Sequence, residues 1–420
     1  MKQFMNTKEA LVTEALDGLI RTSNGRLARL DGYPHIKVAV RTDWDRSKVA
    51  LVSGGGSGHE PSHAGFVGQG MLTAAVCGDV FASPSVDAVL AGILAVTGKA
   101  GCLLIVKNYT GDRLNFGLAA ERARAFGLKV SMVIVDDDVA LPDLPQARGV
   151  AGTLFVHKIA GAMAEAGADL DTITAAAQRI IGGAISIGMS LDTCTVPGSP
   201  KEDRIGLGKA ELGLGIHGEA GVEQVDFSGA RAAMAMVVDR LLPHLGKGDH
   251  VALLNNLGST TPLEMSVLAE ELARSPLGAR VKWMIGPAPL MTSLDMHGFS
   301  VSLLPVTQGE VAHLGAPVAP PAWPGLSTLA PVALRPLPDG LTPIQPLPSA
   351  HPAHRALLDR CCSALIACET DLNALDAKSG DGDTGSTLAG AARALQAALD
   401  RLPLADATQL YRAIGTELSQ

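Results

Sequence analysis

The stretch K-V-A-L-V-S-G-G-G-S-G-H-E-P-S at residues 48–62 sets the pattern for the first part of the chain. Its apolar run, residues 49–52, ends in a glycine cluster, which is typical of a buried strand leading into a tight loop. Such glycines allow positive φ angles and let a ligand approach the backbone closely. Ligands bind outside the carboxyl ends of strands in open α/β sheets. A turn that only packs two layers is the alternative, but His59 and Glu60 after the glycines favour a binding site.

Composition narrows the class of protein. A chain of 420 residues has room for two or three domains, and its 47% apolar and 3% aromatic residues are typical of α/β enzymes. A net charge of −8 without a basic stripe argues against nucleic acid as a partner. The six cysteines show no metal-ligand spacing, which favours a reduced, cytoplasmic protein. The first residues lack the apolar core of a signal peptide, and charges interrupt the apolar stretches, so we expect no membrane association.

Strand-like and helical runs alternate over the first half of the chain. After an opening helix at residues 6–20, strands are expected at 38–40, 49–52, 102–106 and 130–135, and helices at 86–95, 115–126 and 153–165. This alternation predicts βαβ units around a largely parallel sheet.

A second α/β run follows a glycine-dense segment at residues 206–221. Helices are expected at 229–242 and 262–274, and strands at 251–254, 281–285 and 300–305. The strand that breaks into a Gly/Ser loop at 250–262 resembles the one at 48–59. The sequence therefore predicts two α/β subdomains of related strand-and-loop organisation, at 1–190 and 191–316.

The rest of the chain changes character. Eleven of the 25 prolines fall between Pro317 and Pro352, which predicts a semi-rigid linker at 317–350. Helical stripes follow at 357–366 and 388–402, with a short acidic loop between them, and a third helix begins near 406. Three short helices enclose little core, so residues 351–420 are expected to be an incomplete all-α piece.

Polar residues that follow strands or interrupt glycine runs are candidates for chemistry. Lys107 and Asp112 follow the strand at 102–106 and should emerge on the same sheet edge as His59; a solvated loop is the alternative. His217 lies in G-L-G-I-H-G-E-A-G at 213–221, and its neutral imidazole could add to an electrophilic carbon. A surface histidine, or one satisfied in the core, is the alternative for His217.

Three carboxylates crowd a loop between the expected helices. Asp376, Asp381 and Asp383 are separated by glycines in L-N-A-L-D-A-K-S-G-D-G-D-T-G-S-T at 372–387. The spacing is not that of an EF-hand, and oxygen ligands of this kind suit Mg²⁺ bound together with phosphate. A simple Asp/Gly turn is the alternative.

These motifs together resemble those of the ATP-dependent dihydroxyacetone (glycerone) kinases. The resemblance rests on S-G-G-G-S-G-H-E-P-S-H-A-G-F-V-G at 53–68, A-A-V-C-G-D-V-F-A-S-P-S at 74–85, L-L-I-V-K-N-Y-T-G-D-R-L-N-F at 103–116, G-V-A-G-T-L-F-V-H-K-I-A-G at 149–161, L-G-L-G-I-H-G-E at 212–219 and the acidic loop. It implies a K domain that holds the triose and a helical-barrel L domain that holds nucleotide and Mg²⁺. A homodimer is also implied.

The resemblance assigns roles to particular residues. It implies that His217 bonds covalently to the substrate carbonyl carbon as a hemiaminal, that Asp112 acts as base on the terminal hydroxyl, and that His59 assists at the hemiaminal oxygen. Substrate contacts are implied for Gly56, Ser57, Gly58, His59, Lys107 and Asp112. Asp376, Asp381 and Asp383 are implied as ligands of two Mg²⁺ ions, and Asp383, Thr384, Gly385 and Ser386 as nucleotide contacts.

The expected function is a cytoplasmic kinase of glycerol metabolism that phosphorylates dihydroxyacetone, or a related short sugar such as glyceraldehyde or erythrulose, with Mg-ATP. The alternative is a ketose-binding subunit or sensor without kinase activity of its own. Ser379 stands where the family usually has an aliphatic residue. The family's L domain continues well beyond the motifs found here, so this chain is expected to tether the ketose but to phosphorylate it weakly or not at all unaided.

Overall fold

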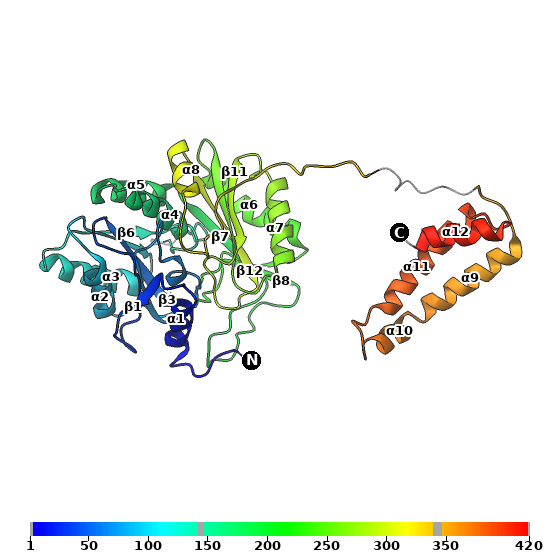
Figure 1. The fold of residues 1–420 in the computed structure, drawn as a ribbon, viewed down its shortest axis with the longest axis horizontal. Coiled ribbons are helices and arrows are strands. Elements are labelled where there is room, and N and C mark those ends of the chain that lie inside the picture. Colours follow the sequence, from blue (N-terminus) through cyan, green and yellow to red (C-terminus); the bar gives the residue numbers. More distant parts are fainter. Residues whose placement is uncertain (1–2, 142–146, 339–346, 419–420) are drawn as a thin grey trace. The chain divides into compact units, whose positions relative to one another are not determined.

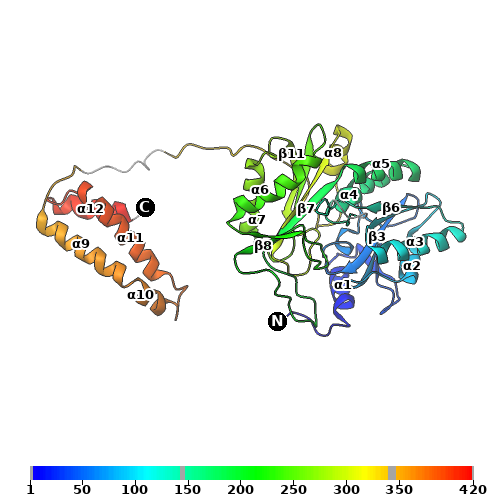
Figure 2. The same cartoon turned by 180° about the vertical axis from the view of Figure 1, so that it is seen from behind.

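The structure, a computed structural model, describes residues 3–141, 147–338 and 347–418 (Figures 1 and 2). The chain forms two compact units, Met1–Pro331 and Val332–Gln420. The first unit is α/β with two sheets, and the described part of the second is helical. The predicted fold class, α/β followed by an all-α piece, is confirmed. Among the described helices, none is both long and apolar enough to cross a membrane.

The first sheet has the strand order β1-β2-β4-β3-β5-β6. Strands β4, β3, β5 and β6 run parallel, and β2 and β1 extend one edge antiparallel. The elements are α1 (Leu11–Arg21), β1 (Leu27–Arg29), β2 (Val38–Arg41), β3 (Ala50–Ser57), β4 (Ala74–Val80), α2 (Val86–Val96), β5 (Cys102–Lys107), α3 (Thr110–Ala125), β6 (Val130–Val135), α4 (Thr153–Glu165) and α5 (Leu170–Gly183). The largely parallel sheet predicted from the alternation is confirmed.

Helices cover both faces of this sheet (Figure 1). In β5, Leu103 and Ile105 enter the core on the side of α4 and α5, whereas Cys102, Leu104 and Val106 enter the core under α2 and α3. Neighbouring residues of a strand point to opposite faces, so a strand buried on both sides has a continuous apolar sequence. This is why the apolar runs in the sequence located the strands.

Three predicted boundaries were wrong. The opening helix begins at Leu11 rather than at residue 6, and the other two errors concern the site. Strand β3 continues through the glycines, because they still pair with β4. Helix α3 begins at Thr110 rather than at residue 115, so Asp112 lies in its first turn and not in a loop. A carboxylate is favourable at that position, because the amino-terminal end of a helix carries partial positive charge.

The second sheet has the strand order β13-β11-β10-β12-β7-β8-β9. Its elements are β7 (Ile185–Ser190), β8 (Lys209–Leu212), β9 (Glu223–Asp226), α6 (Ala230–Leu241), β10 (His250–Asn256), α7 (Pro262–Arg274), β11 (Val281–Ala288), β12 (Gly298–Pro305), α8 (Gln308–Gly315) and β13 (Ser327–Thr328). Among these strands, β10 and β11 pair parallel around α7, and the other neighbours pair antiparallel.

The two sheets therefore differ in strand pairing, whereas the sequence suggested a related strand-and-loop organisation. Strands β10 and β12 are buried almost throughout, and such strands have similar apolar runs whether they pair parallel or antiparallel. Strand β7 precedes the boundary expected after residue 190 but belongs to the second sheet. Strands β8 and β9, within or next to the glycine-dense segment, were not predicted.

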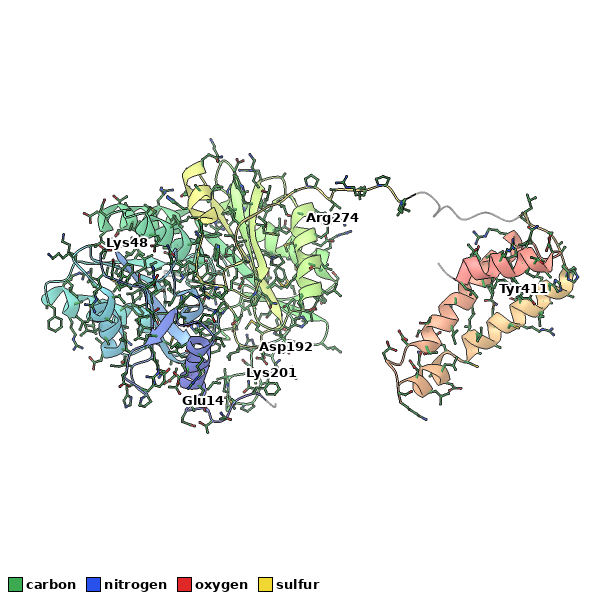
Figure 3. All side chains as sticks on the ribbon, viewed as in Figure 1. Glu14, Lys48, Asp192, Lys201, Arg274 and Tyr411 are labelled. Atoms are coloured by element: carbon green, nitrogen blue, oxygen red, sulfur yellow. The ribbon has the colours of Figure 1, made fainter. Side chains whose placement is uncertain are left out.

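The described residues of the second unit form α9 (Pro352–Ala367), α10 (Glu369–Asp376), α11 (Thr384–Ala398) and α12 (Ala407–Leu418). A small core joins α9, α11 and α12 around Cys362, Leu395 and Leu410. Helix α10 occupies residues expected in the acidic loop, and the acidic side chains in its first turn favour a helix start there. Tyr411 on α12 is 75% exposed (Figure 3).

Strand β3 depends on glycine at position 54 for its pairing. A Cβ added to Gly54 would lie 2.1 Å from the backbone oxygen of Val76 on β4. We expect Gly54→Ala to lower the free energy of unfolding of the first unit by about 3 kcal/mol, the upper end of typical overpacking effects. Gly18→Ala in α1 is the control, because nothing lies within 4 Å of its added Cβ. Equal denaturation midpoints for the two variants would contradict this prediction.

Candidate active site

The glycines at the end of β3 bring two polar side chains against the backbone. A Cβ on Gly55, whose φ is +144°, would lie 3.2 Å from Asp112 Oδ2 and 3.5 Å from Lys107 Nζ. Added Cβ atoms on Gly56 and Gly58 would each come within 2.8 Å of Phe81. The small residues therefore allow this close approach, whereas Ser57 turns its hydroxyl to the Gly78 carbonyl.

Lys107 and Asp112 come from neighbouring elements and are both buried. Lys107 ends β5 and is 0% exposed, and Asp112 in α3 is 2% exposed. Among the described residues, neither Lys107 Nζ nor Asp112 Oδ1 has a hydrogen-bond partner. Burial lowers the pKa of Lys107, although the charges of Asp112 and Glu219 favour its protonated form. Buried polar atoms without partners are costly, so this pair is suited to contact the polar groups of a ligand.

His59 joins the two sheets. Its Nδ1 lies 2.8 Å from the carbonyl oxygen of Thr292, in the loop between β11 and β12. A carbonyl only accepts hydrogen bonds, so Nδ1 carries the proton and Nε2 has a free lone pair. Within the described chain, Nε2 has no partner. Burial, together with the charge of Lys107, lowers the pKa of His59 well below its ordinary value, so the ring is neutral.

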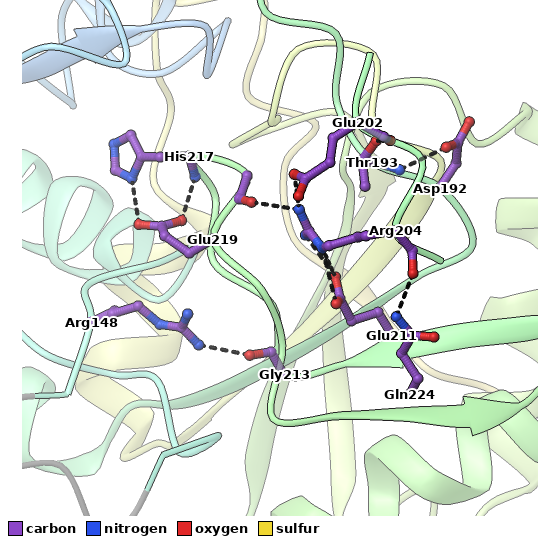
Figure 4. Close-up of polar contacts among 11 residues, drawn as sticks. Arg148, Asp192, Thr193, Glu202, Arg204, Glu211, Gly213, His217, Glu219 and Gln224 are labelled. Atoms are coloured by element: carbon purple, nitrogen blue, oxygen red, sulfur yellow. Dashed lines mark hydrogen bonds and ion pairs between the residues drawn. The ribbon is translucent and has the colours of Figure 1, made fainter. Parts of the chain in front are cut away.

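His217 lies at the tip of the hairpin formed by β8 and β9. Its ring centroid is 4.7 Å from that of His59. Glu219 accepts hydrogen bonds from the His217 backbone nitrogen at 2.8 Å and from Nδ1 at 3.3 Å (Figure 4). Burial opposes ionisation of Glu219, but the hydrogen bonds from the side chain and backbone of His217, together with the charge of its ring, outweigh burial and lower the pKa of Glu219 to about 2. The carboxylate therefore holds the Nδ1 proton and leaves Nε2 as a nucleophile.

The structure thus brings together His59, Lys107, Asp112 and His217, and it adds three residues that sequence reasoning missed. The rings of Phe81 and Tyr109 lie edge-on to His217, with centroids at 5.3 and 4.4 Å. Both aromatic residues lie inside motifs quoted above, and their scarcity in this chain could have identified them. Glu219 follows His217 by two positions, which could have suggested that it orients the imidazole.

Two further imidazoles are buried behind the site. His157 Nε2 lies 3.1 Å from Ser53 Oγ, and the ring centroids of His63 and His157 are 5.2 Å apart. Burial, together with the charge of Lys107, lowers the pKa of His157 to about 3 and that of His63 well below its ordinary value. Both rings are neutral in the folded chain at neutral pH.

The buried His157 predicts a loss of stability in acid. In the unfolded chain this residue binds a proton near pH 6.5, but in the folded chain it does so only near pH 3. Between these values the unfolded state holds more protons, so the free energy of unfolding falls as the pH falls. We expect His157→Gln to lose about 2 kcal/mol less than the wild type between pH 7 and pH 5. Parallel pH profiles in denaturant titrations would contradict this.

An apolar cavity lies on another side of the glycine loop. It has a volume of about 450 Å³ and lies between α1 and residues 319–322. Gly55, Gly56 and Ser57 line it, whereas Lys107, Asp112 and His217 do not. The cavity therefore does not coincide with the cluster of polar side chains.

The acidic loop of the second unit gathers its three carboxylates. Oxygen atoms of Asp376, Asp381 and Asp383 lie within 4.8 Å of one another. Asp376 Oδ2 accepts hydrogen bonds from the backbone nitrogens of Gly382, Asp383 and Thr384, which fixes the loop. The nearby Asp381 carboxylate raises the pKa of Asp383. This set of carboxylate oxygens fits a divalent cation such as Mg²⁺.

The residues expected to contact nucleotide begin α11. Gly385 is buried, and a Cβ there would lie 2.0 Å from the backbone oxygen of Glu369. This glycine is therefore required for close packing of α11 on α10. The backbone nitrogen of Ser386 donates to Asn373 Oδ1 at 3.0 Å. These contacts with α10 fix the start of α11, which lies next to the carboxylate cluster.

Comparison with known proteins places this geometry in a family. The Dak1 domain profile matches residues 17–322. A dihydroxyacetone kinase of Citrobacter freundii is 47% identical over 421 residues, which are 99% of this chain and 76% of that protein. The chain belongs to the dihydroxyacetone kinase family. The predicted resemblance is confirmed.

Other members of the dihydroxyacetone kinase family match in different ways. The crystal structure of the C. freundii kinase in complex with AMP-PNP and Mg²⁺ has a TM-score of 0.81 and 46% identity, and it covers 100% of this chain and 79% of that one. The dihydroxyacetone-binding subunit of a PTS-dependent dihydroxyacetone kinase of Listeria innocua is 42% identical, over 77% of this chain and 100% of its own length. The match to the C. freundii structure spans the whole chain and so includes the residues of the candidate site.

Proposed function

We propose that this chain is an ATP-dependent kinase that phosphorylates the terminal hydroxyl of dihydroxyacetone while the ketose is tethered to His217. The observation that best supports this proposal is the position of the His217 ring, whose centroid lies 4.7 Å from that of His59 and whose Nδ1 faces Glu219. Gly56, Ser57 and Gly58 would form the floor of the site. The family relationship supports ATP as co-substrate, dihydroxyacetone as acceptor and Mg²⁺ as cofactor.

The tether uses the free lone pair of His217. Nε2 forms a bond to the carbonyl carbon, the π electrons move to the oxygen, and the oxygen takes up a proton from solvent. His59 Nε2 accepts a hydrogen bond from the new hydroxyl. Nδ1 keeps its proton, and the ionised Glu219 balances the positive charge that the imidazole acquires. Glycerol has no electrophilic carbon, so the bond selects a carbonyl substrate.

Phosphoryl transfer then uses Asp112. The terminal hydroxyl oxygen bonds to the γ-phosphorus of ATP, the bond to the β-phosphate oxygen breaks, and Asp112 accepts the hydroxyl proton. The Lys107 ammonium stabilises the negative charge nearby. Asp376, Asp381 and Asp383 would hold Mg²⁺, which neutralises phosphate charge, and Thr384, Gly385 and Ser386 would lie beside the phosphates.

The arrangement along the chain is part of the proposal. We assign residues 1–331 to the ketose-binding K domain and 351–420 to the nucleotide-binding part. The expected linker at 317–350 overlaps the first unit, because β13 pairs with β11. The six free cysteines support a reducing compartment such as the cytoplasm. The family resemblance supports a homodimer, which analytical ultracentrifugation would test.

The test follows phosphate by ³¹P NMR with the 420-residue chain, Mg-ATP and dihydroxyacetone. Dihydroxyacetone phosphate and ADP are expected, with no transfer to glycerol. Asp112→Asn should slow the transfer by about 10²–10⁴-fold, and intact-protein mass should still show the ketose adduct. Asp87→Asn, a surface ion-pair residue on α2, is the matched control. Equal transfer to glycerol, or an Asp112→Asn rate equal to wild type, would overturn the proposal.

The second candidate is a ketose-binding subunit or sensor. The Listeria subunit favours this candidate, because that protein is named as a binding subunit and matches this chain over its full length, which is 77% of this chain. The carboxylate cluster of the second unit favours the kinase instead. Isothermal titration distinguishes the two, because a sensor binds only the ketose, whereas a kinase binds ketose and Mg-ATP.

A further inference from the structure

The segment that carries His217 has little intrinsic rigidity. Strands β8 and β9 pair up to Leu212 opposite Glu223, so the residues between them form a long hairpin loop. Glycines at 213, 215, 218 and 221 interrupt this loop, and Gly213 and Gly218 adopt positive φ angles of +69° and +82°. Glycine loses more conformational freedom on ordering than other residues, so such a loop needs contacts from outside to fix its tip.

One outside contact comes from Arg148, before α4. Its Nη2 donates to the Gly213 carbonyl oxygen at 2.7 Å, where the loop leaves β8. Its Nε donates at 2.7 Å to Asp138, whose side chain is only 4% exposed. The notional Cβ of Gly215 would collide with both Arg148 and Glu219, so these side chains meet across that glycine.

The second contact comes from Arg204, on the other side of the loop (Figure 4). Its Nη1 donates to the Gly218 carbonyl oxygen at 3.0 Å, directly after His217. Its Nε and Nη2 donate to both carboxylate oxygens of Glu211 on β8, with Nη2 at 2.7 Å from Oε2. The Glu211 side chain is 4% exposed, so its ion pair with Arg204 is not a mobile surface contact.

We propose that Arg148 and Arg204 are positioning residues for the covalent step, and this rests on the proposed tether at His217. Each guanidinium is held by a buried carboxylate and bonds a loop carbonyl, one before and one after the imidazole. Arginine suits this task, because its planar fork offers separate donors to a carboxylate and a carbonyl. The loop is thereby fixed before the ketose arrives.

Pre-organisation should act on the covalent step more than on polar binding. Nε2 must meet the carbonyl carbon at bonding distance, and misplacement by about 1 Å can cost on the order of 10²-fold. The contacts from His59, Lys107 and Asp112 come from other elements and do not depend on the loop. Loss of either arginine should therefore lower the covalent fraction of bound ketose, while noncovalent contacts persist.

The experiment uses dihydroxyacetone labelled with ¹³C at the carbonyl and the full 420-residue chain. NMR distinguishes bound ketose with a trigonal carbon from the tetrahedral adduct. Arg204→Gln and Arg148→Gln are each expected to lower the covalent fraction by about 10-fold or more, and Arg204→Lys should restore it in part. Lys209→Gln is the matched control, because Lys209 pairs with Asp226 across the same two strands without touching the loop. It should retain the wild-type fraction.

The outcomes separate this inference from the proposed function. If the wild type shows no tetrahedral carbon, the tether itself fails. If the wild type shows it and both arginine variants keep the same fraction, only the positioning role is overturned. Should Arg204→Gln fail to fold, Glu211→Gln gives the same test, because it weakens the anchor of Arg204 with little change of size. An unchanged fraction in Glu211→Gln would then contradict the role of Arg204.

Discussion

His217→Ala is expected to abolish the covalent ketose adduct completely. The variant lacks the nitrogen that we propose as the nucleophile, and the nearby His59 cannot replace it. His59 keeps a free lone pair on Nε2, but the bond from Nδ1 to Thr292 and burial fix its ring, so Nε2 cannot move to the position of the missing nitrogen. Mass spectrometry of the intact protein, after incubation with dihydroxyacetone, should show an increase by the mass of the ketose in the wild type and none in the variant.

The same substitution should change the selectivity of the site. Without the covalent bond, a ketose and a polyol of the same size offer similar hydrogen-bonding groups, and so few atoms bind weakly. We expect dihydroxyacetone and glycerol to become nearly equivalent ligands of His217→Ala in isothermal titration. The exposed His244→Ala is the control and should retain both adduct and selectivity. An adduct that survives in His217→Ala would assign the tether to another nucleophile.

The first sheet was predictable because local apolar runs in the sequence mark its strands. The apolar runs of β3 and β5 end where polar residues begin, so His59 and Lys107 were expected on one sheet edge. Strand and helix alternation then implied parallel neighbours. The error at β3 has a local cause as well. Glycine usually ends a strand, but here it is required inside one, because β4 approaches Gly54 too closely for a side chain.

The partners of the two histidines could not be predicted in this way. His59 is bonded to Thr292, 233 positions away, and no local pattern encodes a pairing between such distant segments. Strand β9, which completes the hairpin under His217, is an exposed edge strand with the polar sequence Glu-Gln-Val-Asp. It has no apolar run that could identify it. The glycines at 213–221 indicated a loop, but they could not show that its tip reaches the first sheet.

The acidic loop supports the second large prediction, a loss of magnesium-dependent ATP binding in Asp381→Asn/Asp383→Asn. Asp376 is less suited to such a test, because its Oδ2 also holds three backbone nitrogens of the loop. Asp381 and Asp383 are exposed, and the repulsion between their carboxylates disappears in the variant. The loop should therefore keep its conformation while it loses the charge that attracts a cation.

We expect this double variant to bind ATP at least about 100-fold more weakly in the presence of Mg²⁺, since changes at residues that merely support metal ligands already cost 10–100-fold. Isothermal titration with and without Mg²⁺ measures the difference. Asp371→Asn, exposed on α10 of the same unit, removes a similar charge away from the cluster and should bind as the wild type does. Because all the proposed ketose contacts come from the first unit, the adduct on His217 should persist in the double variant. Equal Mg-ATP affinities in the three proteins would show that the cluster is an acidic turn and not a metal site.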